Sequence, residues 1–140
     1  MIEKIPLIGR KVKSRPVFAT CGVLVRGTKV WMRKRPGEGL LGGMWEFPGS
    51  GMLDAPPGSD ALWASWRESF GEPPSQVAAL GSVRHVFSHL KLRLEVFEVD
   101  AVGPGVGDGV WKDWRALDSL AVSKLTRKVW ALVASHRELT

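Results

Sequence analysis

Runs of apolar residues in the first third of the chain predict a β-hairpin followed by a short strand. Residues 17–25 are almost all apolar and include several β-branched side chains, which is typical of a strand buried on both faces. After a tight connection at residues 26–28, the side chains of residues 30–35 separate into two faces with a period of two. This alternation predicts the second strand of the hairpin. Residues 45–47 are expected to form a third strand, which ends at the Pro-Gly pair of residues 48–49.

The next segment predicts a short helix over residues 59–70. Ser59 is a good N-cap, and Leu62, Trp66 and Phe70 recur at helical spacing. A glycine follows the last of them, and two prolines beyond it block continuation. A strand, a Gly/Pro-rich loop and a helix in this order usually make a site, because loops held on rigid elements present functional groups.

The second half of the chain is rich in predicted strands. One strand is expected within residues 77–86, and another over residues 90–96, where leucine and valine alternate with charged residues. Phe97 and Val99 then change parity, which indicates a β-bulge or a strand end buried on both sides. Residues 102–109 are expected to form a flexible loop.

The C-terminal part predicts one more strand and a final helix. Residues 110–117 are expected to be a short strand that carries two tryptophans. A helix from about Ser123 places one set of side chains on a common side: Leu125, Val129, Leu132, Val133 and His136.

Composition indicates one basic globular domain. The chain of 140 residues is 44% hydrophobic and 24% charged, which suits a single core. We expect the domain to span residues 17–140, after a basic linker or arm at residues 1–16 that contacts phosphates or remains mobile. The net charge of +6 favours polyanionic partners, above all nucleic acid, although a soluble basic surface would give the same value.

The single cysteine, Cys21, excludes an internal disulfide, a multi-cysteine zinc site and a ligated iron–sulfur cluster within these residues. No apolar run approaches the ~20 residues needed to cross a bilayer, and the first residues lack the compact apolar core of a secretory signal. We therefore expect a cytoplasmic protein without a membrane partner, in which Cys21 is an inert buried thiol.

The order of these elements resembles the Nudix family across nearly the whole chain. The resemblance implies an α+β fold, an α/β/α sandwich in which helices flank a mixed β-sheet. It also implies a helix whose carboxylates gather Mg²⁺ against a pyrophosphate. When the signature is aligned without gaps so that its last glycine falls at Gly71, its conserved positions are occupied, in order, by Ser50, Pro56, Ala64, Ser65, Glu68, Ser69 and Gly71. Only Glu68 and Gly71 agree with the family pattern, so the resemblance implies the fold without magnesium-dependent hydrolysis.

Two separate segments carry a narrower resemblance. RKRPGEGLLGGMWEFP at residues 33–48 and RHVFSHLKLRLEVF at residues 84–97 are similar to the C-terminal domain of MutY-type adenine DNA glycosylases. That domain is a degenerate Nudix fold that helps to recognise 8-oxoguanine opposite the adenine removed in base excision repair. The resemblance implies double-stranded DNA containing 8-oxoguanine and a glycosylase catalytic domain as partners, and a nucleoid-associated location in a bacterial-type cytoplasm. It implies no cofactor in this domain, because the family's iron–sulfur cluster belongs to the catalytic domain.

The same resemblance implies which residues contact DNA. Phe87, Ser88 and His89 match the family's Phe-Ser-His loop, which approaches the oxidised base. A serine hydroxyl both donates and accepts hydrogen bonds, so Ser88 can respond to the altered edge of 8-oxoguanine. The remaining expected contacts, to phosphates, are Arg84, His85, Lys91 and Arg93.

Each of these residues also has an ordinary structural interpretation. Phe87 would equally suit a core position at a strand end, and Ser88 would suit a turn. Lys91 and Arg93 would suit a solvated strand face, and the histidines would suit hydrogen-bonded structural positions.

Two other functions remain open at this point. One is a divergent Nudix hydrolase of nucleoside diphosphate derivatives, with Mg²⁺ as cofactor, in which Glu46, Asp54 or Glu72 replaces the missing ligands. The other is a protein-interaction domain that retains only the fold.

Overall fold

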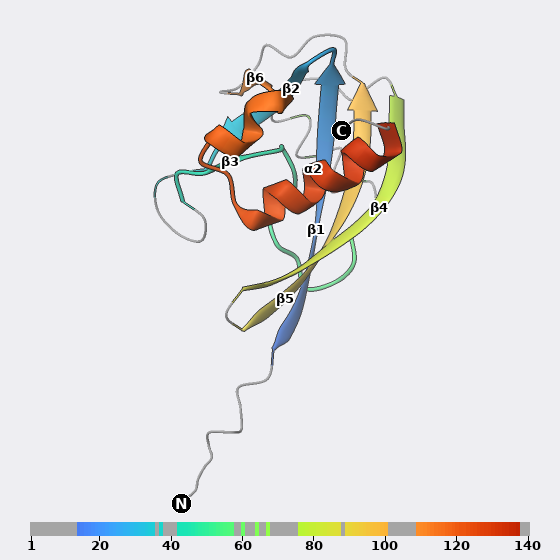
Figure 1. Ribbon diagram of the computed structural model, residues 1–140. Helices are drawn as coiled ribbons and strands as arrows, with labels where there is room; N and C mark the ends of the chain where they lie inside the picture. The colour runs from blue at the N-terminus through green and yellow to red at the C-terminus, as the bar shows by residue number, and fades with distance from the viewer. Residues whose placement is uncertain are drawn as a thin grey trace, which may run out of the picture.

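The structure is a computed structural model that describes residues 14–35, 37, 42–57, 60, 64, 67, 76–87, 89–100 and 109–137. Its centre is a mixed, six-stranded sheet in the order β3-β2-β1-β5-β4, with β6 paired to β2 (Figure 1). The strands are β1 (Arg15–Arg26), β2 (Lys29–Lys34), β3 (Trp45–Glu46), β4 (Gln76–Phe87), β5 (Leu90–Asp100) and β6 (Val110–Asp113). A 3₁₀ helix, η1 (Trp114–Ser119), and a 14-residue helix, α2 (Lys124–Arg137), follow.

The opening hairpin is confirmed: β1 and β2 are antiparallel and joined at Gly27 and Thr28. β1 is longer than expected, because it begins at Arg15, within the segment that we assigned to the basic arm. The two strands pair only near their connection. Farther along β1, the segment after β3 takes the place of β2, with bridges at Cys21–Gly49 and Phe18–Leu53.

The longest pairings surround β5. It runs parallel to β1 and antiparallel to β4. The irregularity that we expected near Phe97 exists, but its extra residue lies in the partner strand, between Ala79 and Gly81 of β4. Val99 is buried on the face opposite Val96, so this end of β5 is also buried on both sides, as expected.

Helix α2 covers one face of the sheet, here called the α2 face. Its start is set by Ser123, whose hydroxyl accepts a hydrogen bond from the Thr126 amide at 3.1 Å. Val129 and Val133 enter the main core. His136, expected on the apolar side, is exposed instead, because it lies in the last turn of the helix.

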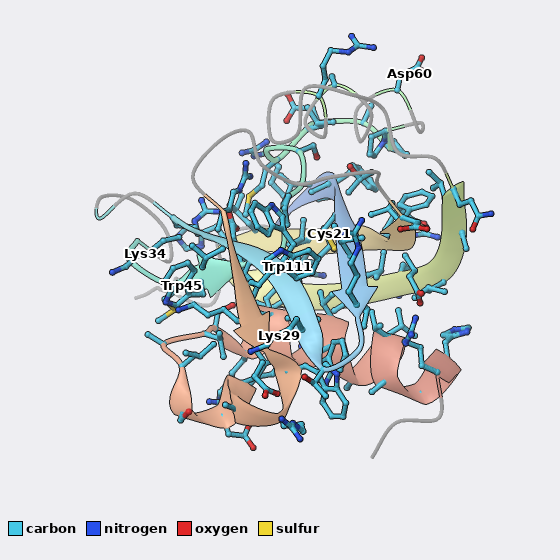
Figure 2. The ribbon with its side chains drawn as sticks, turned by 90° about the horizontal axis from the view of Figure 1, so that it is seen from above. Cys21, Lys29, Lys34, Trp45, Asp60 and Trp111 are labelled. Carbon is cyan, nitrogen blue, oxygen red and sulfur yellow. The ribbon has the colours of Figure 1, made fainter. Side chains whose placement is uncertain are left out.

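The opposite face of the sheet is here called the outer face. Of the helix expected at residues 59–70, the described residues Asp60, Ala64 and Arg67 are helical. Figure 2 places Asp60 on the other side of the sheet from α2. The remainder of that expected helix and most of the expected loop at residues 102–109 lie outside the described residues.

The strand expected over residues 110–117 is confirmed for residues 110–113 and wrong for residues 114–117. β6 stops at Asp113, where the chain turns into η1. The Asp113 carboxylate accepts hydrogen bonds from the Arg115 side chain and backbone, which lower the pKa of Asp113 to about 2. Trp114 anchors the turn by donating from its backbone N–H to Thr28 and from its indole N–H to Gly27. This capping favours a helical turn over a continued strand.

Within the described part of the chain, no helix has the length and apolar character that crossing a membrane requires.

Candidate nucleic-acid interface

The β4–β5 hairpin carries the residues expected to contact DNA. Its two strands pair without interruption from Gly81–Val96 to Phe87–Leu90. The hairpin end and the start of β1 extend together beyond α2 (Figure 1). The Arg15 amide donates to the His89 carbonyl at 2.7 Å, so β1 supports the turn from one side. The hairpin therefore presents its tip away from the body of the domain on a supported strand pair.

The outer face of this hairpin is basic. Arg84 lies opposite Arg93, and Val86 lies opposite Lys91, and all of these side chains are exposed. Arg93 pairs with Glu95 at 3.0 Å, whereas Arg84 and Lys91 have no acidic partner among the described residues. Like charges placed directly across a strand pair destabilise it. Of these positions, Arg84 and Arg93 face each other as like charges, and Glu95 offsets the charge of Arg93.

An apolar floor accompanies these cations. Val86 is 61% exposed. With Pro16 and Phe18 of β1 and the three cations, it lines a shallow depression of about 270 Å³. A surface that combines long cationic side chains with apolar contact area suits a sugar-phosphate backbone.

The α2 face of the hairpin differs. Phe87 is only 8% exposed and belongs to the main core, so its ring can reach a base only if the hairpin changes conformation. His85 packs edge-on against Phe87, with ring centroids 4.6 Å apart. Burial, followed by the charges of Lys128 and Lys124, lowers the pKa of His85. His85 and Phe87 therefore lie on the opposite side of the hairpin from Arg84, Lys91 and Arg93.

Lys128 of α2 joins the helix to this hairpin. Its ammonium donates to the Arg84 carbonyl at 2.9 Å and lies 3.0 Å from Nδ1 of His85. Because an ammonium can only donate, this contact makes Nδ1 of His85 the acceptor and places the ring proton on Nε2. His89 is exposed at the turn, and Ser88 lies outside the described residues. No local sequence pattern signals the contact of Lys128, since it depends on how the helix crosses the sheet.

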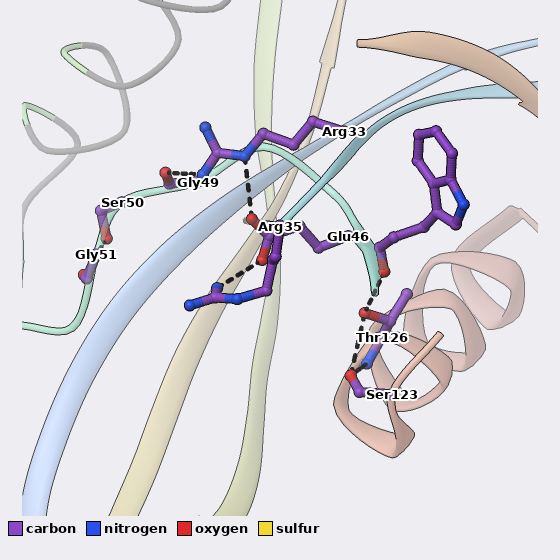
Figure 3. Close-up of polar contacts among 9 residues, drawn as sticks. Arg33, Arg35, Glu46, Gly49, Ser50, Gly51, Ser123 and Thr126 are labelled. Carbon is purple, nitrogen blue, oxygen red and sulfur yellow. Dashed lines mark hydrogen bonds and ion pairs between the residues drawn. The ribbon is translucent and has the colours of Figure 1, made fainter. Parts of the chain in front are cut away.

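A second polar cluster lies where β3 meets β2. Glu46 accepts hydrogen bonds from Arg33 at 3.0 Å and from Arg35 at 2.9 Å (Figure 3). Arg33 also donates to the Gly49 carbonyl at 3.1 Å. The pairing of Arg33 with Glu46 across the two strands fixes this geometry. These residues were expected in strands but were not expected to meet, although their period-two spacing and the strand order contained that signal.

This cluster borders a cavity of about 170 Å³ between the sheet and α2. Its walls include Leu94, Leu125 and Val129, and Cys21 lies among them. Burial, and secondarily the charge of Glu46, raises the pKa of the Cys21 thiol far above its usual range. The thiol is therefore protonated and unreactive, as expected from its apolar strand.

No metal centre is assembled within the described residues: no group of three or more His, Cys, Asp or Glu side chains could hold an ion there. Glu46 is occupied by two guanidinium groups, and exposed Asp54 pairs with Arg15 at 2.7 Å. Glu68 and Glu72 lie outside the described residues. Of the carboxylates expected as replacement ligands, the two that the structure describes, Glu46 and Asp54, are thus engaged with arginines.

Comparison with known proteins agrees with the fold. Residues 20–132 match the NUDIX domain family, so the chain belongs to that family. The expected Nudix fold, with its mixed sheet, is confirmed.

Its similarity to adenine DNA glycosylases is also confirmed. The chain is 34% identical to the adenine DNA glycosylase of Rattus norvegicus over 151 aligned residues, which cover 94% of this chain but 28% of that protein. The chain therefore spans little more than a quarter of the length of this relative.

A solved structure and a shorter relative complete the comparison. The C-terminal domain of mouse MUTYH, crystallised with human PCNA, superposes with a TM-score of 0.73 at 26% identity, covering 89% of this chain and 91% of that one. The 8-oxo-dGTP diphosphatase of Proteus vulgaris is 33% identical over 70 residues, which cover 50% of this chain and 62% of that protein.

Proposed function

We propose that this chain is the lesion-recognition domain of an adenine DNA glycosylase, which helps to recognise 8-oxoguanine opposite the adenine to be excised. The observation that carries the proposal is the arrangement of residues on the β4–β5 hairpin. This hairpin holds the Phe-Ser-His segment at its tip and unpaired cations on its outer face. The similarity of nearly the whole chain to part of adenine DNA glycosylases supports the same conclusion.

In this proposal, one set of residues positions the hairpin on DNA and another residue recognises the base. Arg84, Lys91 and Arg93 would contact phosphates and set the position of the hairpin, because backbone contacts carry no sequence information. Ser88 would contact the base. Guanine has an acceptor at N7, whereas 8-oxoguanine has a hydrogen there and an added oxygen at carbon eight, so one hydroxyl can distinguish the two edges.

The neighbouring residues would support this contact. Phe87 would hold the turn through its place in the core. His85 would present its Nε2 proton, because Lys128 occupies Nδ1, and His89 would brace the loop or reach a phosphate. No bond would be broken in this domain. Excision would belong to a partner catalytic domain, which would carry the family's iron–sulfur cluster, and the reading domain would need no cofactor.

Direct binding to defined duplexes tests this proposal. We would measure the affinity of the chain for duplexes with adenine opposite 8-oxoguanine and opposite guanine, for the unaltered chain, Ser88→Ala and Lys91→Gln. We expect Ser88→Ala to reduce the ratio of the two affinities and Lys91→Gln to weaken both duplexes equally. Equal losses on both duplexes for Ser88→Ala would refute the assignment of Ser88 as the reading residue.

A second candidate function rests on the cavity beside Glu46 and on the similarity to an 8-oxo-dGTP diphosphatase. A cavity of about 170 Å³ could hold a nucleobase, but hydrolysis would need carboxylates to gather Mg²⁺. Glu46 and Asp54 already have arginine partners. Magnesium-dependent release of pyrophosphate or phosphate from 8-oxo-dGTP by the purified chain would favour this alternative.

A further inference from the structure

The β4–β5 hairpin has cations beside both of its faces. Arg84, Lys91 and Arg93 stand on the outer face. On the α2 face, Lys128 reaches the hairpin backbone, and Lys124 lies one helical turn before it. β1 pairs with β5 along the same residues, so this end of the sheet has three strands, and the two sets of cations lie on its opposite faces. These two sets are here called the two rails.

We propose that Lys124 and Lys128 form a second phosphate-binding rail, so that the two rails contact different phosphate backbones of duplex DNA. This inference rests on the proposed function and extends it to a surface of α2. One DNA strand would follow Arg84, Lys91 and Arg93, and the other would follow the two lysines.

The contacts of Lys128 leave it able to bind a phosphate. Its ammonium has three protons, and the Arg84 carbonyl and Nδ1 of His85 accept two of them. The side chain is exposed, so the third proton is available to an anionic oxygen. Nε2–H of neutral His85 adds a donor on the same face. Lys128 therefore both fixes the hairpin to α2 and offers charge beside it.

The position of Lys124 is unfavourable for the helix alone. It is the first residue of α2, where the helix dipole disfavours a positive charge, and no acidic residue occupies the first turn. Lys124 and Lys128 are spaced four residues apart on a helix, where like charges repel. Within the described residues neither lysine has an acidic partner. A bound polyanion would offset all of these repulsions.

Arg127 provides a matched contrast on the same helix. It is exposed, lies next to Lys128 in sequence, and pairs with Asp118 at 2.8 Å. Its charge is therefore directed to η1 and away from the hairpin. The two-rail arrangement predicts that replacing Arg127 has no effect on DNA binding.

Salt dependence of binding by the whole chain tests the proposal. Each phosphate contact contributes about 0.9 to the slope of log K against log salt for B-DNA. We expect Lys124→Gln and Lys128→Gln each to lower the slope by about 0.9, as Lys91→Gln should on the outer face. Arg127→Gln should leave the slope unchanged.

Because Lys128→Gln also removes two contacts to the hairpin, two further variants separate charge from structure. Lys124 makes no hydrogen bond to the hairpin among the described residues, so Lys124→Gln tests the effect of charge alone. Lys128→Arg keeps the charge and should restore the slope. An unchanged slope in Lys124→Gln and Lys128→Gln, with a reduced slope in Lys91→Gln, would overturn the second rail and leave the proposed function intact. Absence of salt-dependent duplex binding by the unaltered chain would overturn both.

Neutral methylphosphonate linkages test the strand assignment. Placed in one strand at a time, they should abolish the effect of the lysine variants in one strand and the effect of Lys91→Gln in the other. If neutralising the same strand abolishes both effects, the two rails contact one strand, and their assignment to different backbones is wrong.

Discussion

Two arginine-rich regions of this domain use their charge in opposite ways. Beside β3, Arg33 and Arg35 share the carboxylate of Glu46, and Arg33 also bonds a carbonyl. On the β4–β5 hairpin, Arg84 and Lys91 have no acidic partner in the part of the chain that the structure describes. The first group is satisfied internally and contributes to folding. The second group lacks such an internal partner among the described residues, and under the proposed function it binds an external anion.

Under the proposed function, this contrast separates structural residues from functional ones. If it is correct, changes beside β3 should alter the free energy of unfolding, and changes on the hairpin should alter DNA binding. The following predictions, from the largest expected effect to the smallest, test that separation.

Gly49→Ala should have the largest effect. A Cβ atom at this position would lie 2.2 Å from the Thr20 carbonyl oxygen and 2.9 Å from the Cys21 Cα. Both are backbone atoms of β1, so the segment after β3 would have to move away from the strand. We expect a loss of about 3 kcal/mol in the free energy of unfolding, measured in urea. Gly51→Ala is the control, because nothing lies within 4 Å of its added Cβ, and a similar loss there would contradict the packing argument.

Glu46→Gln should come next. It leaves two half-buried guanidinium groups facing a neutral amide, and we expect destabilisation of about 2 kcal/mol. Glu95→Gln is the matched control, because Glu95 has one arginine partner among the described residues, on a strand face that is more exposed. Exposed pairs contribute about 0.2–1 kcal/mol. Glu95→Gln should in addition strengthen DNA binding by freeing Arg93, whereas equal destabilisation by the two variants would erase the contrast.

The double variant Arg84→Gln/Lys91→Gln should leave stability within about 0.5 kcal/mol of the unaltered chain. It should weaken binding to all duplexes by at least roughly tenfold at moderate salt, through the loss of two phosphate contacts. Fluorescence anisotropy at several salt concentrations would measure this. A large drop in melting temperature without a change in binding would place these residues with the structural group.

The smallest effect should be a pH dependence of stability from His85. Burial and the charges of Lys128 and Lys124 lower its pKa from 6.5 in the folded state. A group whose folded pKa is lowered contributes stability above its unfolded pKa and loses it as the pH falls. The melting temperature should therefore decrease on acidification below about pH 6.5, and His85→Gln should reduce this decrease. An unchanged pH profile in His85→Gln would show that the ring is not held neutral by the two lysines.

Much of this fold followed from periodicity alone. The alternation in residues 90–96 and the continuous apolar run in residues 17–25 predicted β5 and β1, because burial on one or both faces leaves a direct pattern in the sequence. The parity change at Phe97 indicated an irregularity, but periodicity in one strand could not show that the extra residue lay in its partner. At residues 114–117, apolar spacing suggested a strand, and the capping by Asp113 determined a 3₁₀ helix instead.

The candidate site was less predictable, because it depends on which residues share a face. Arg84, His85, Lys91 and Arg93 form one basic group in the sequence, but the strand pairing places His85 on the α2 face and the others on the outer face. The contacts of Lys128 arise from the packing of a helix against a strand more than 40 positions away, and no local pattern encodes them.

Adenine excision gives the most direct test of the central claim that this domain reads the lesion. The chain would be joined to a glycosylase catalytic domain, and excision would be measured opposite 8-oxoguanine and opposite guanine, with and without Ser88→Ala. We predict that the unaltered fusion excises adenine faster opposite 8-oxoguanine, and that Ser88→Ala reduces this preference while the hairpin remains folded. An unchanged preference in the variant would contradict the account and direct attention to magnesium-dependent hydrolysis.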